Sequence, residues 1–295
     1  MIDVVRYKKI FLSLSAILVL AAIVGILAFG LRPGVDFTGG SLWQIKFSEI
    51  VSKTDIRDFF ETQINLPPTS LSYDQTSGVY SLVLREIPDA ERQSAFSAIK
   101  EKLDPEAEEQ DFWSISPSVS REIKDKAMQA IVFVIVGISL FVAYAFRHAS
   151  KAIKSWKYGV VTLITLAHDV VIPIGAFAII GYYMDLTIDT TFVVALLLIM
   201  GFSVHDTIVV FDRIRESIIK TRHIEMGTIV NKSINETLKR SINTSFTLVL
   251  VLLALLFLGP ASLRYFMLIM LIGTVVGTYS SIFVASPILT LFRRS

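Results

Sequence analysis

Residues 190–211 read TTFVVALLLIMGFSVHDTIVVF, an apolar stretch with one acidic side chain, Asp206, inside it. A helix of this length, at about 1.5 Å per residue, crosses a hydrocarbon core about 30 Å thick. A second such stretch contains only Asp169, and four more contain no charged residue. The sequence therefore predicts six membrane-spanning helices. We expect them at residues 10–31, 127–146, 158–182, 190–211, 241–258 and 266–290.

The composition supports the same fold class. The 295 residues are 53% hydrophobic and 18% charged, with a mean hydropathy of +0.61, which leaves too few polar side chains to cover one soluble domain. A soluble single-domain enzyme is thereby excluded. The chain has no cysteine, which excludes disulfide bonds and thiolate metal sites. The net charge of +2, without a basic tail, argues against nucleic acid as a partner.

Residues 32–126 contain no apolar run long enough to span a membrane, and they carry 17 acidic against 11 basic residues. Their hydrophobic pattern predicts strands and helices in the order βαββαβ, which is typical of a small ferredoxin-like module. We therefore expect an α+β domain at residues 32–120, inserted between the first and second spans. The expected elements are strands at 41–47, 69–74, 79–85 and 112–116 and helices at 53–64 and 88–103.

The distribution of Lys and Arg predicts the orientation in the membrane. The short loops on one side hold sixteen of these residues, and those on the other side hold only Arg264. By the positive-inside rule, both termini are cytoplasmic and the 32–120 domain lies on the opposite, periplasmic side. Residues 1–31 then form the N-terminus and a retained first helix, and residues 121–295 form the other five helices with short loops.

Four polar residues in or beside the spans are candidates for a proton pathway: Asp206, Arg240, Asp169 and His205. An ionised carboxylate at membrane depth costs roughly 2.5–3.5 kcal/mol, so it requires a partner, water or a proton. Asp169 lies about 18 Å along its helix from Lys157, near the midplane, and Asp206 lies about 9 Å inside its span. Arg240 begins a polar stripe at helical spacing, and we expect its guanidinium to face Asp206 and stabilise the ionised form.

Each candidate also has a structural interpretation. Hydroxyl groups, or His168 in the case of Asp169, can hold the two carboxylates in place. Arg240 can extend to the cytoplasmic interface, and a neutral His205 can pack between helices. The last span carries small residues at four-residue intervals, which predicts close helix packing rather than chemistry. These residues are Gly273, Gly277, Ser281 and Ala285.

Motifs of enzymatic catalysis are missing from the sequence. It contains neither a Gly-rich phosphate loop ending in Lys-Ser/Thr nor a His-Glu-x-x-His pair. The adjacent pairs His168-Asp169 and His205-Asp206 point about 100° apart around a helix, so neither is a ready two-ligand metal motif. The sequence therefore predicts no enzymatic activity, no cofactor and no metal.

Four segments together resemble the SecF family of protein-export membrane subunits. They read VDFTGG at 35–40, AHD at 167–169, SVHDTIVVFDRIRE at 203–216 and GTYSSIFVA at 277–285. The likeness extends over nearly the whole chain, and the 203–216 segment is its most specific part. The residues that match the family motifs are Asp36, Phe37, Gly39, Gly40, Ser203, Thr207, Asp212 and Arg213.

The resemblance implies an accessory subunit of the Sec translocase in the bacterial inner membrane. Family members pair with SecD, and each partner resembles one half of a resistance-nodulation-division transporter. The pair is expected to use the proton motive force to promote preprotein translocation through the SecYEG channel after the ATP-driven step. The implied partners are therefore SecD, SecYEG, the preprotein and membrane lipid. Asp206 and Arg240 match the family's proton-pathway positions, and Asp169 matches a polar family position.

The chain departs from the family pattern at two places. The family commonly has Tyr-Ser-x-Asn-Asp where this chain has Phe-Ser-Val-His-Asp at 202–206, so His205 replaces an amide with a group that titrates near neutral pH. Residues 258–261, LGPA, replace a Gly-Gly turn.

Two other functions stay open at this point. One is a scaffold whose buried charges only keep the helices in register while the partner carries protons. The other is one half of a proton-driven exporter of small molecules or lipids, against which the small size of the 32–120 domain argues.

Overall fold

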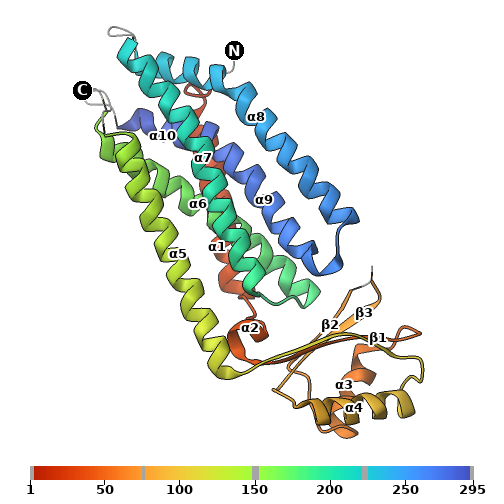
Figure 1. The fold of residues 1–295 in the computed structure, drawn as a ribbon. Coiled ribbons are helices and arrows are strands. Elements are labelled where there is room, and N and C mark those ends of the chain that lie inside the picture. Colours follow the sequence, from red (N-terminus) through yellow and green to blue (C-terminus); the bar gives the residue numbers. More distant parts are fainter. Residues whose placement is uncertain (1–2, 75–76, 148–152, 221–224, 293–295) are drawn as a thin grey trace. The chain divides into compact units, whose positions relative to one another are not determined.

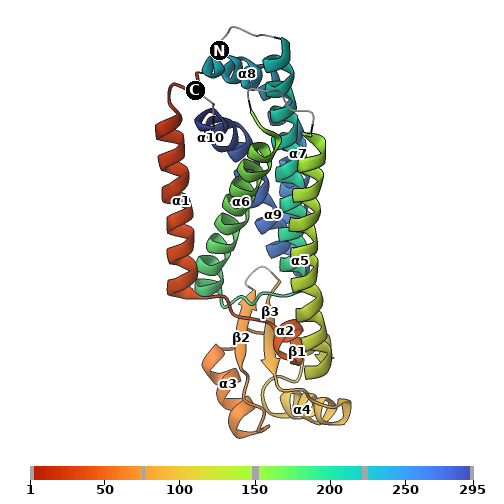
Figure 2. The ribbon, with the colours of Figure 1, turned by 90° about the vertical axis from the view of Figure 1, so that its left-hand side faces the viewer.

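The structure is a computed structural model, and it describes residues 3–74, 77–147, 153–220 and 225–292. The chain forms two compact units (Figure 1; Figure 2). The helical unit comprises Met1–Gly30, Ala130–Ile179 and Thr191–Ser295. The α+β unit comprises Leu31–Gln129 together with the short segment Ile180–Thr190.

Six helices in the described part of the chain are long and apolar enough to cross a membrane, which confirms the predicted membrane fold. The last of them is divided into three consecutive segments. The six are α1 (Lys8–Phe29), α5 (Pro117–Ala145), α6 (Ser155–Met184), α7 (Thr190–Lys220), α8 (Met226–Leu258) and Arg264–Leu291, which consists of α9 (Arg264–Ser280), the π-helical turn η2 (Ser281–Ala285) and α10 (Ser286–Leu291).

Helices α7 and α8 are longer than the spans expected at 190–211 and 241–258, where the sequence analysis placed a loop between them. Beyond the apolar part of α7, Ile214 and Ile218 continue its buried face. Val230 and Ile234 do the same in the first half of α8. Apolar residues at helical spacing among charged ones make these extensions amphipathic, so both helices continue past the hydrophobic spans.

The break in the last helix has a local cause. Pro287 lacks the backbone N–H that would bond to the carbonyl of Phe283, and its ring disfavours a regular turn before it. The chain widens into η2, and the Ser286 hydroxyl donates to the carbonyl of Ser281 over a distance of 2.9 Å. The wide turn therefore keeps part of its hydrogen bonding through a side chain.

The α+β unit contains a four-stranded antiparallel sheet in the order β2-β3-β1-β4. With the chain order βαββαβ, this confirms the predicted ferredoxin-like module. Alternate side chains of β1, including Trp43 and Ile45, pack with Ile56, Phe60 and other residues of a buried core. The elements are β1 (Gly40–Lys46), α3 (Lys53–Thr62), β2 (Ser70–Asp74), β3 (Val79–Leu84), α4 (Asp89–Lys102) and β4 (Glu108–Ile115).

The VDFTGG box forms the short helix α2 (Val35–Thr38) and the turn into β1. Gly39 and Gly40 both have positive φ, +78° and +117°. A Cβ on Gly40 would lie 2.4 Å from the carbonyl oxygen of Leu84, which no side chain tolerates. The two glycines are therefore required by the turn that starts the central strand.

The same box holds the first residue of α7 within the α+β unit. Asp36 Oδ2 accepts hydrogen bonds from the backbone N–H of Thr190, at 2.7 Å, and from its hydroxyl, at 2.6 Å. Preceding residues pair with the same segment, since Gly34 N–H donates to the carbonyl of Ile188 at 2.8 Å. Asp36 thus satisfies a backbone donor that the start of a helix leaves free.

Two cations stabilise the segment just before α7. Arg32 and Lys53 each lie 2.9 Å from Asp185, which has a φ of 55°. Burial alone would raise the pKa of the Asp185 carboxyl, but hydrogen bonds and positive charge from Lys53 and Arg32 outweigh it and lower this pKa.

Glycines allow close contacts in the helical unit. A Cβ on Gly175 of α6 would lie 2.4 Å from Cα of Ala22 in α1. In α9, a Cβ on Gly273 would meet Ile199 at 2.3 Å, and one on Gly277 would meet Ser203 at 3.1 Å. Helices α1 and α6, and likewise α7 and α9, therefore approach each other nearly backbone to backbone.

We expect Gly175→Ala to destabilise the helical unit, by about 1–3 kcal/mol, because the added methyl group overlaps the backbone of α1. Thermal unfolding of the purified chain in detergent measures the effect. Gly137→Ala is the matched control, because a Cβ on Gly137 of α5 meets nothing within 4 Å. Equal stabilities of the two variants would contradict the proposed close contact.

We expect Asp36→Ala to loosen the start of α7 by about 0.5–2 kcal/mol, because two hydrogen bonds to Thr190 are lost. Hydrogen exchange of the amides at 190–193 in the full chain should become faster, whereas Asp36→Asn, which keeps an acceptor oxygen, should have a smaller effect. Asp58→Ala on an exposed position of α3 serves as the control. Unchanged protection in Asp36→Ala would disprove the capping role.

Candidate functional site

Asp206 lies buried in the middle of α7, with 6% of its surface exposed. Both of its carboxylate oxygens accept hydrogen bonds from serine hydroxyls. Ser241 of α8 donates to Oδ1 at 2.6 Å, and Ser281, at the start of η2, donates to Oδ2 at 2.6 Å. The carboxylate therefore joins three helices through hydroxyl groups rather than through a cation.

Asp169 of α6 is completely buried. Its Oδ1 lies 2.8 Å from Nδ1 of His168, while its Oδ2 accepts from the hydroxyls of Ser203 of α7 and, at 2.6 Å, Ser280 of α9. Pro173 removes the backbone N–H that would bond to the carbonyl of Asp169 one turn earlier. This second carboxylate joins α6, α7 and α9 in the same way as the first joins α7, α8 and η2.

The two carboxylate clusters are neighbours. Ser203 and Asp206 lie one turn apart on α7, and Ser280 and Ser281 are consecutive in the last helix. Helix α7 and the last helix, at the junction of α9 and η2, therefore contribute to both clusters. The sequence analysis had assigned Ser281 to packing alone and had not singled out Ser241 or Ser280.

Arg240 does not reach Asp206, contrary to the expected pairing; among the residues that the structure describes, no ion pair joins the two. Its side chain is exposed, as are those of Asn243, Thr244 and Thr247, which form the polar stripe seen in the sequence. A different stripe of hydroxyl residues faces the interior of the unit. It consists of Ser233, Thr237, Ser241 and Ser245, all at four-residue spacing.

Arg240 instead lines a surface cavity of about 220 Å³ between α5, α7 and α8. Asp212 also lines this cavity, and the rest of the lining is apolar, including Phe146, Ile208 and Val209. His205 is exposed and lies on the same face of α7 as Ile208, Val209 and Asp212. The predicted proton-pathway residues thus form an inner pair, Asp206 and Asp169, and an outer pair, Arg240 and His205.

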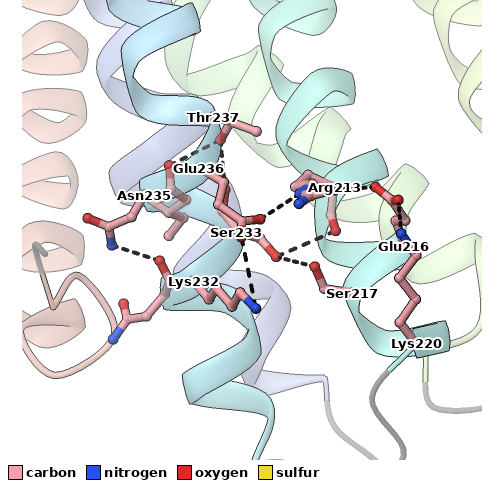
Figure 3. Close-up of polar contacts among 11 residues, drawn as sticks. Arg213, Glu216, Ser217, Lys220, Lys232, Ser233, Asn235, Glu236 and Thr237 are labelled. Atoms are coloured by element: carbon pink, nitrogen blue, oxygen red, sulfur yellow. Dashed lines mark hydrogen bonds and ion pairs between the residues drawn. The ribbon is translucent and has the colours of Figure 1, made fainter.

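Two further motif residues of α7, Thr207 and Arg213, differ in their polar contacts. Thr207 is buried, and its hydroxyl has no hydrogen-bond partner within the described ranges. Arg213 binds Glu236 of α8 at 2.6 Å and Glu216 of its own helix at 2.5 Å (Figure 3). Ser233 of α8 donates to the hydroxyl of Ser217 beside this network, at 3.1 Å (Figure 3). The contacts of Arg213 with Glu236 and of Ser233 with Ser217 hold the amphipathic extensions of α7 and α8 together.

A metal site is not found in the described part of the chain, where no three His, Asp or Glu residues are grouped to bind one ion. Four motif residues, Asp36, Phe37, Gly39 and Gly40, belong to the α+β unit and form the turn and helix cap described above. The chemistry of the helical site is therefore that of buried carboxylates, hydroxyls and one imidazole.

Comparison with known proteins identifies the family. The family model of the protein export membrane protein SecD/SecF, C-terminal region, matches residues 95–295, and the SecD/SecF GG motif matches residues 24–49. Protein translocase subunit SecF of Thermobaculum terrenum is 40% identical, over 98% of this chain and 93% of that protein. The SecF of Petrotoga mobilis is 33% identical, over 97% of this chain and 94% of its own length.

A solved structure agrees with these matches. The crystal structure of SecDF from Thermus thermophilus, described as a translocon-associated membrane protein, superposes with a TM-score of 0.83 at 32% identity. The match covers 97% of this chain but only 38% of that longer chain. With its six apolar helices, its ferredoxin-like insertion and its near full-length relatives, the chain belongs to the SecF family of protein translocase subunits.

Proposed function

We propose that this chain pairs with SecD in the bacterial inner membrane and uses the proton motive force to promote preprotein translocation through SecYEG after the ATP-dependent step. It acts as a mechanical subunit and not as an enzyme. The observation that carries the proposal is that Asp206 is buried and hydrogen-bonded to two serine hydroxyls, with no cation paired to it among the described residues. Membrane orientation follows the Lys/Arg bias, with both termini in the cytoplasm.

A carboxylate in this setting is suited to take up and release a proton. An isolated negative charge inside a membrane protein is costly, and a proton removes that cost. Serine hydroxyls are suited to both forms, because they donate to an ionised carboxylate and accept from a protonated one. An arginine in contact with Asp206 would instead favour the ionised form alone.

Arg240 provides such a contact only after a change in α8. It is the neighbour of Ser241, and successive residues point about 100° apart around a helix. A rotation of α8 that withdraws Ser241 would bring Arg240 toward Asp206 and favour proton release. We propose that this alternation between a hydroxyl and a guanidinium at Asp206 is the step that the proton drives.

The exposed polar residues of α7 and α8 support SecD as the partner on this face. His205, Arg240 and Asn243 lie on the surface of the helical unit at or near the membrane spans, where lipid gives them no hydrogen-bond partners. A second membrane subunit with polar groups would satisfy them. We place SecD over the face that carries the 220 Å³ cavity and expect proton access to Asp206 from there.

A scaffold function remains the second candidate, and one observation favours it: all four of the serine bonds to the two carboxylates join different helices. In that case the carboxylates keep one protonation state, and their only effect is on assembly.

We expect Asp206→Asn to assemble with SecD but to lose the acceleration of export by the proton motive force. Moving one charge through 100 mV is worth about 2.3 kcal/mol, so the loss reaches at most roughly fifty-fold in rate. Preprotein export is measured with and without an uncoupler, with Asp58→Asn as the control for an exposed carboxylate.

Export that keeps its full response to the uncoupler in Asp206→Asn would contradict the proton role. Loss of SecD during purification of Asp206→Asn would support the scaffold instead. Arg240→Gln distinguishes the scaffold from the proton mechanism further. The scaffold predicts normal export, because this position is exposed. The proton mechanism predicts slower export, because proton release from Asp206 becomes slower.

A further inference from the structure

Two consecutive serines at the junction of α9 and η2 contact two different carboxylates. Ser280 donates to Asp169 and Ser281 donates to Asp206, each at 2.6 Å. All four residues are buried, and the two serines have no exposed surface. A single peptide unit therefore connects the two acidic groups of the helical unit.

Each of these hydroxyls also has a second acceptor. The Ser280 hydroxyl lies 3.1 Å from the carbonyl oxygen of Gly277, and the Ser281 hydroxyl lies 3.0 Å from that of Thr278. A hydroxyl carries one hydrogen, so it donates either to the carboxylate or to the backbone carbonyl. When it turns to the carbonyl, its lone pair faces the carboxyl group and accepts from a protonated acid. Both serines can follow the protonation state of their acid without losing a hydrogen bond.

Tyr279, the residue before the two serines, lies beside His168. The ring of Tyr279 stacks on His168, with ring centroids 6.5 Å apart and planes inclined by 28°. His168 Nδ1 lies beside Asp169, and its Nε2 is buried without a hydrogen-bond partner within the described ranges. The Tyr279 hydroxyl donates to the carbonyl of Phe11 in α1, at 3.1 Å. Residues 279, 280 and 281 therefore contact His168, Asp169 and Asp206 in turn.

The backbone that follows Ser280 departs from a regular α-helix. The π-helical turn begins at Ser281, and such turns lack the regular i→i−4 bonds that hold a helix rigid. A shift of Ser281 is thus transmitted to Ser280 through one peptide bond, while the turn after it absorbs the change. This geometry is suited to relay motion between two sites.

We propose that Ser280 and Ser281 couple the two buried acids, so that protonation of Asp206 changes the proton affinity of the Asp169–His168 pair. This deepens the proposed function by naming a second acid that responds to Asp206. Of the titratable groups near these clusters, His168 on α6 contacts Asp169 directly, Tyr279 on α9 stacks on His168, and Asp206 lies one turn along α7 from Ser203. The other hydrogen-bond partners that the structure describes for Asp169 are the hydroxyls of Ser203 and Ser280.

The coupling is testable by infrared spectroscopy of the full chain in lipid nanodiscs. The carbonyl band of each protonated acid is identified by its loss in Asp169→Asn or Asp206→Asn, and it is followed as a function of pH. We expect Asp206→Asn to move the titration midpoint of the Asp169 band by at least about one pH unit, the size that marks interacting sites.

The serine variants distinguish the relay from direct electrostatic interaction. In a Ser281→Ala background, Asp206→Asn should no longer move the Asp169 midpoint, and Ser281→Thr, which keeps the hydroxyl, should restore the effect. Thr274→Val is the matched control, because Thr274 is buried in α9 and donates only to the carbonyl of Met270, at 2.7 Å, among the hydrogen bonds described for it. The shift should persist in that background.

An unchanged Asp169 midpoint in Asp206→Asn would overturn the proposal even if Ser281→Ala failed to fold. A shift that persists in Ser281→Ala would overturn the relay and leave only direct charge interaction. The bands are measured on the chain alone, without export or SecD, so failure of this proposal is distinguishable from failure of the proposed function.

Discussion

Hydrogen bonds between serine hydroxyls and buried carboxylates are the interaction on which the helical unit depends. Asp169 and Asp206 together bind serines from α7, α8 and the last helix. A charged acceptor makes each such bond worth about 1.5–3 kcal/mol, comparable to the roughly 2.5–3.5 kcal/mol cost of one charge at membrane depth. The bonds are therefore strong enough to fix the register of the helices, yet the serines bring no positive charge that would hold an acid in one ionisation state.

Close packing makes these bonds possible. A serine side chain is short, so its hydroxyl reaches a carboxylate on another helix only when the backbones nearly touch. Gly277 lies directly against Ser203, and Gly273 lies against Ile199, which brings α9 onto α7 at the level where Ser203 and Ser280 meet Asp169. The small-residue seam and the polar clusters are thus two parts of one arrangement, because the glycines set the distance that the serines bridge.

Sequence reasoning reached the six spans and the ferredoxin-like order, because these follow from apolar length and periodicity. It did not predict the hydrogen-bond partner of Asp206. Helix α8 carries two polar stripes, and the sequence analysis favoured the stripe with Arg240 because its charge is opposite to that of a carboxylate. The rotation of α8 is fixed by Val230, Ile234 and the following buried hydroxyl residues, in a region that the sequence analysis treated as a loop. Hydroxyl residues at four-residue spacing, ending in Ser241 and Ser245, were the available signal, but serine and threonine are too common in helices to stand out.

In the proposed mechanism, the two stripes of α8 allow a helix fixed by its apolar residues to switch. The buried stripe offers hydroxyls, which tolerate a carboxylate or a carboxylic acid, and the exposed stripe offers Arg240, which stabilises only the carboxylate. In the proposed mechanism, a change in the charge of Asp206 changes which face of α8 is preferred. The ion pair of Arg213 with Glu236 meanwhile keeps the amphipathic end of α8 against that of α7. Because a surface ion pair is individually weak, this pair permits rotation of α8 but opposes separation of α8 from α7. In the proposed mechanism, coupling of a proton to motion thus requires only that one helix present two chemically different neighbours to the same acid.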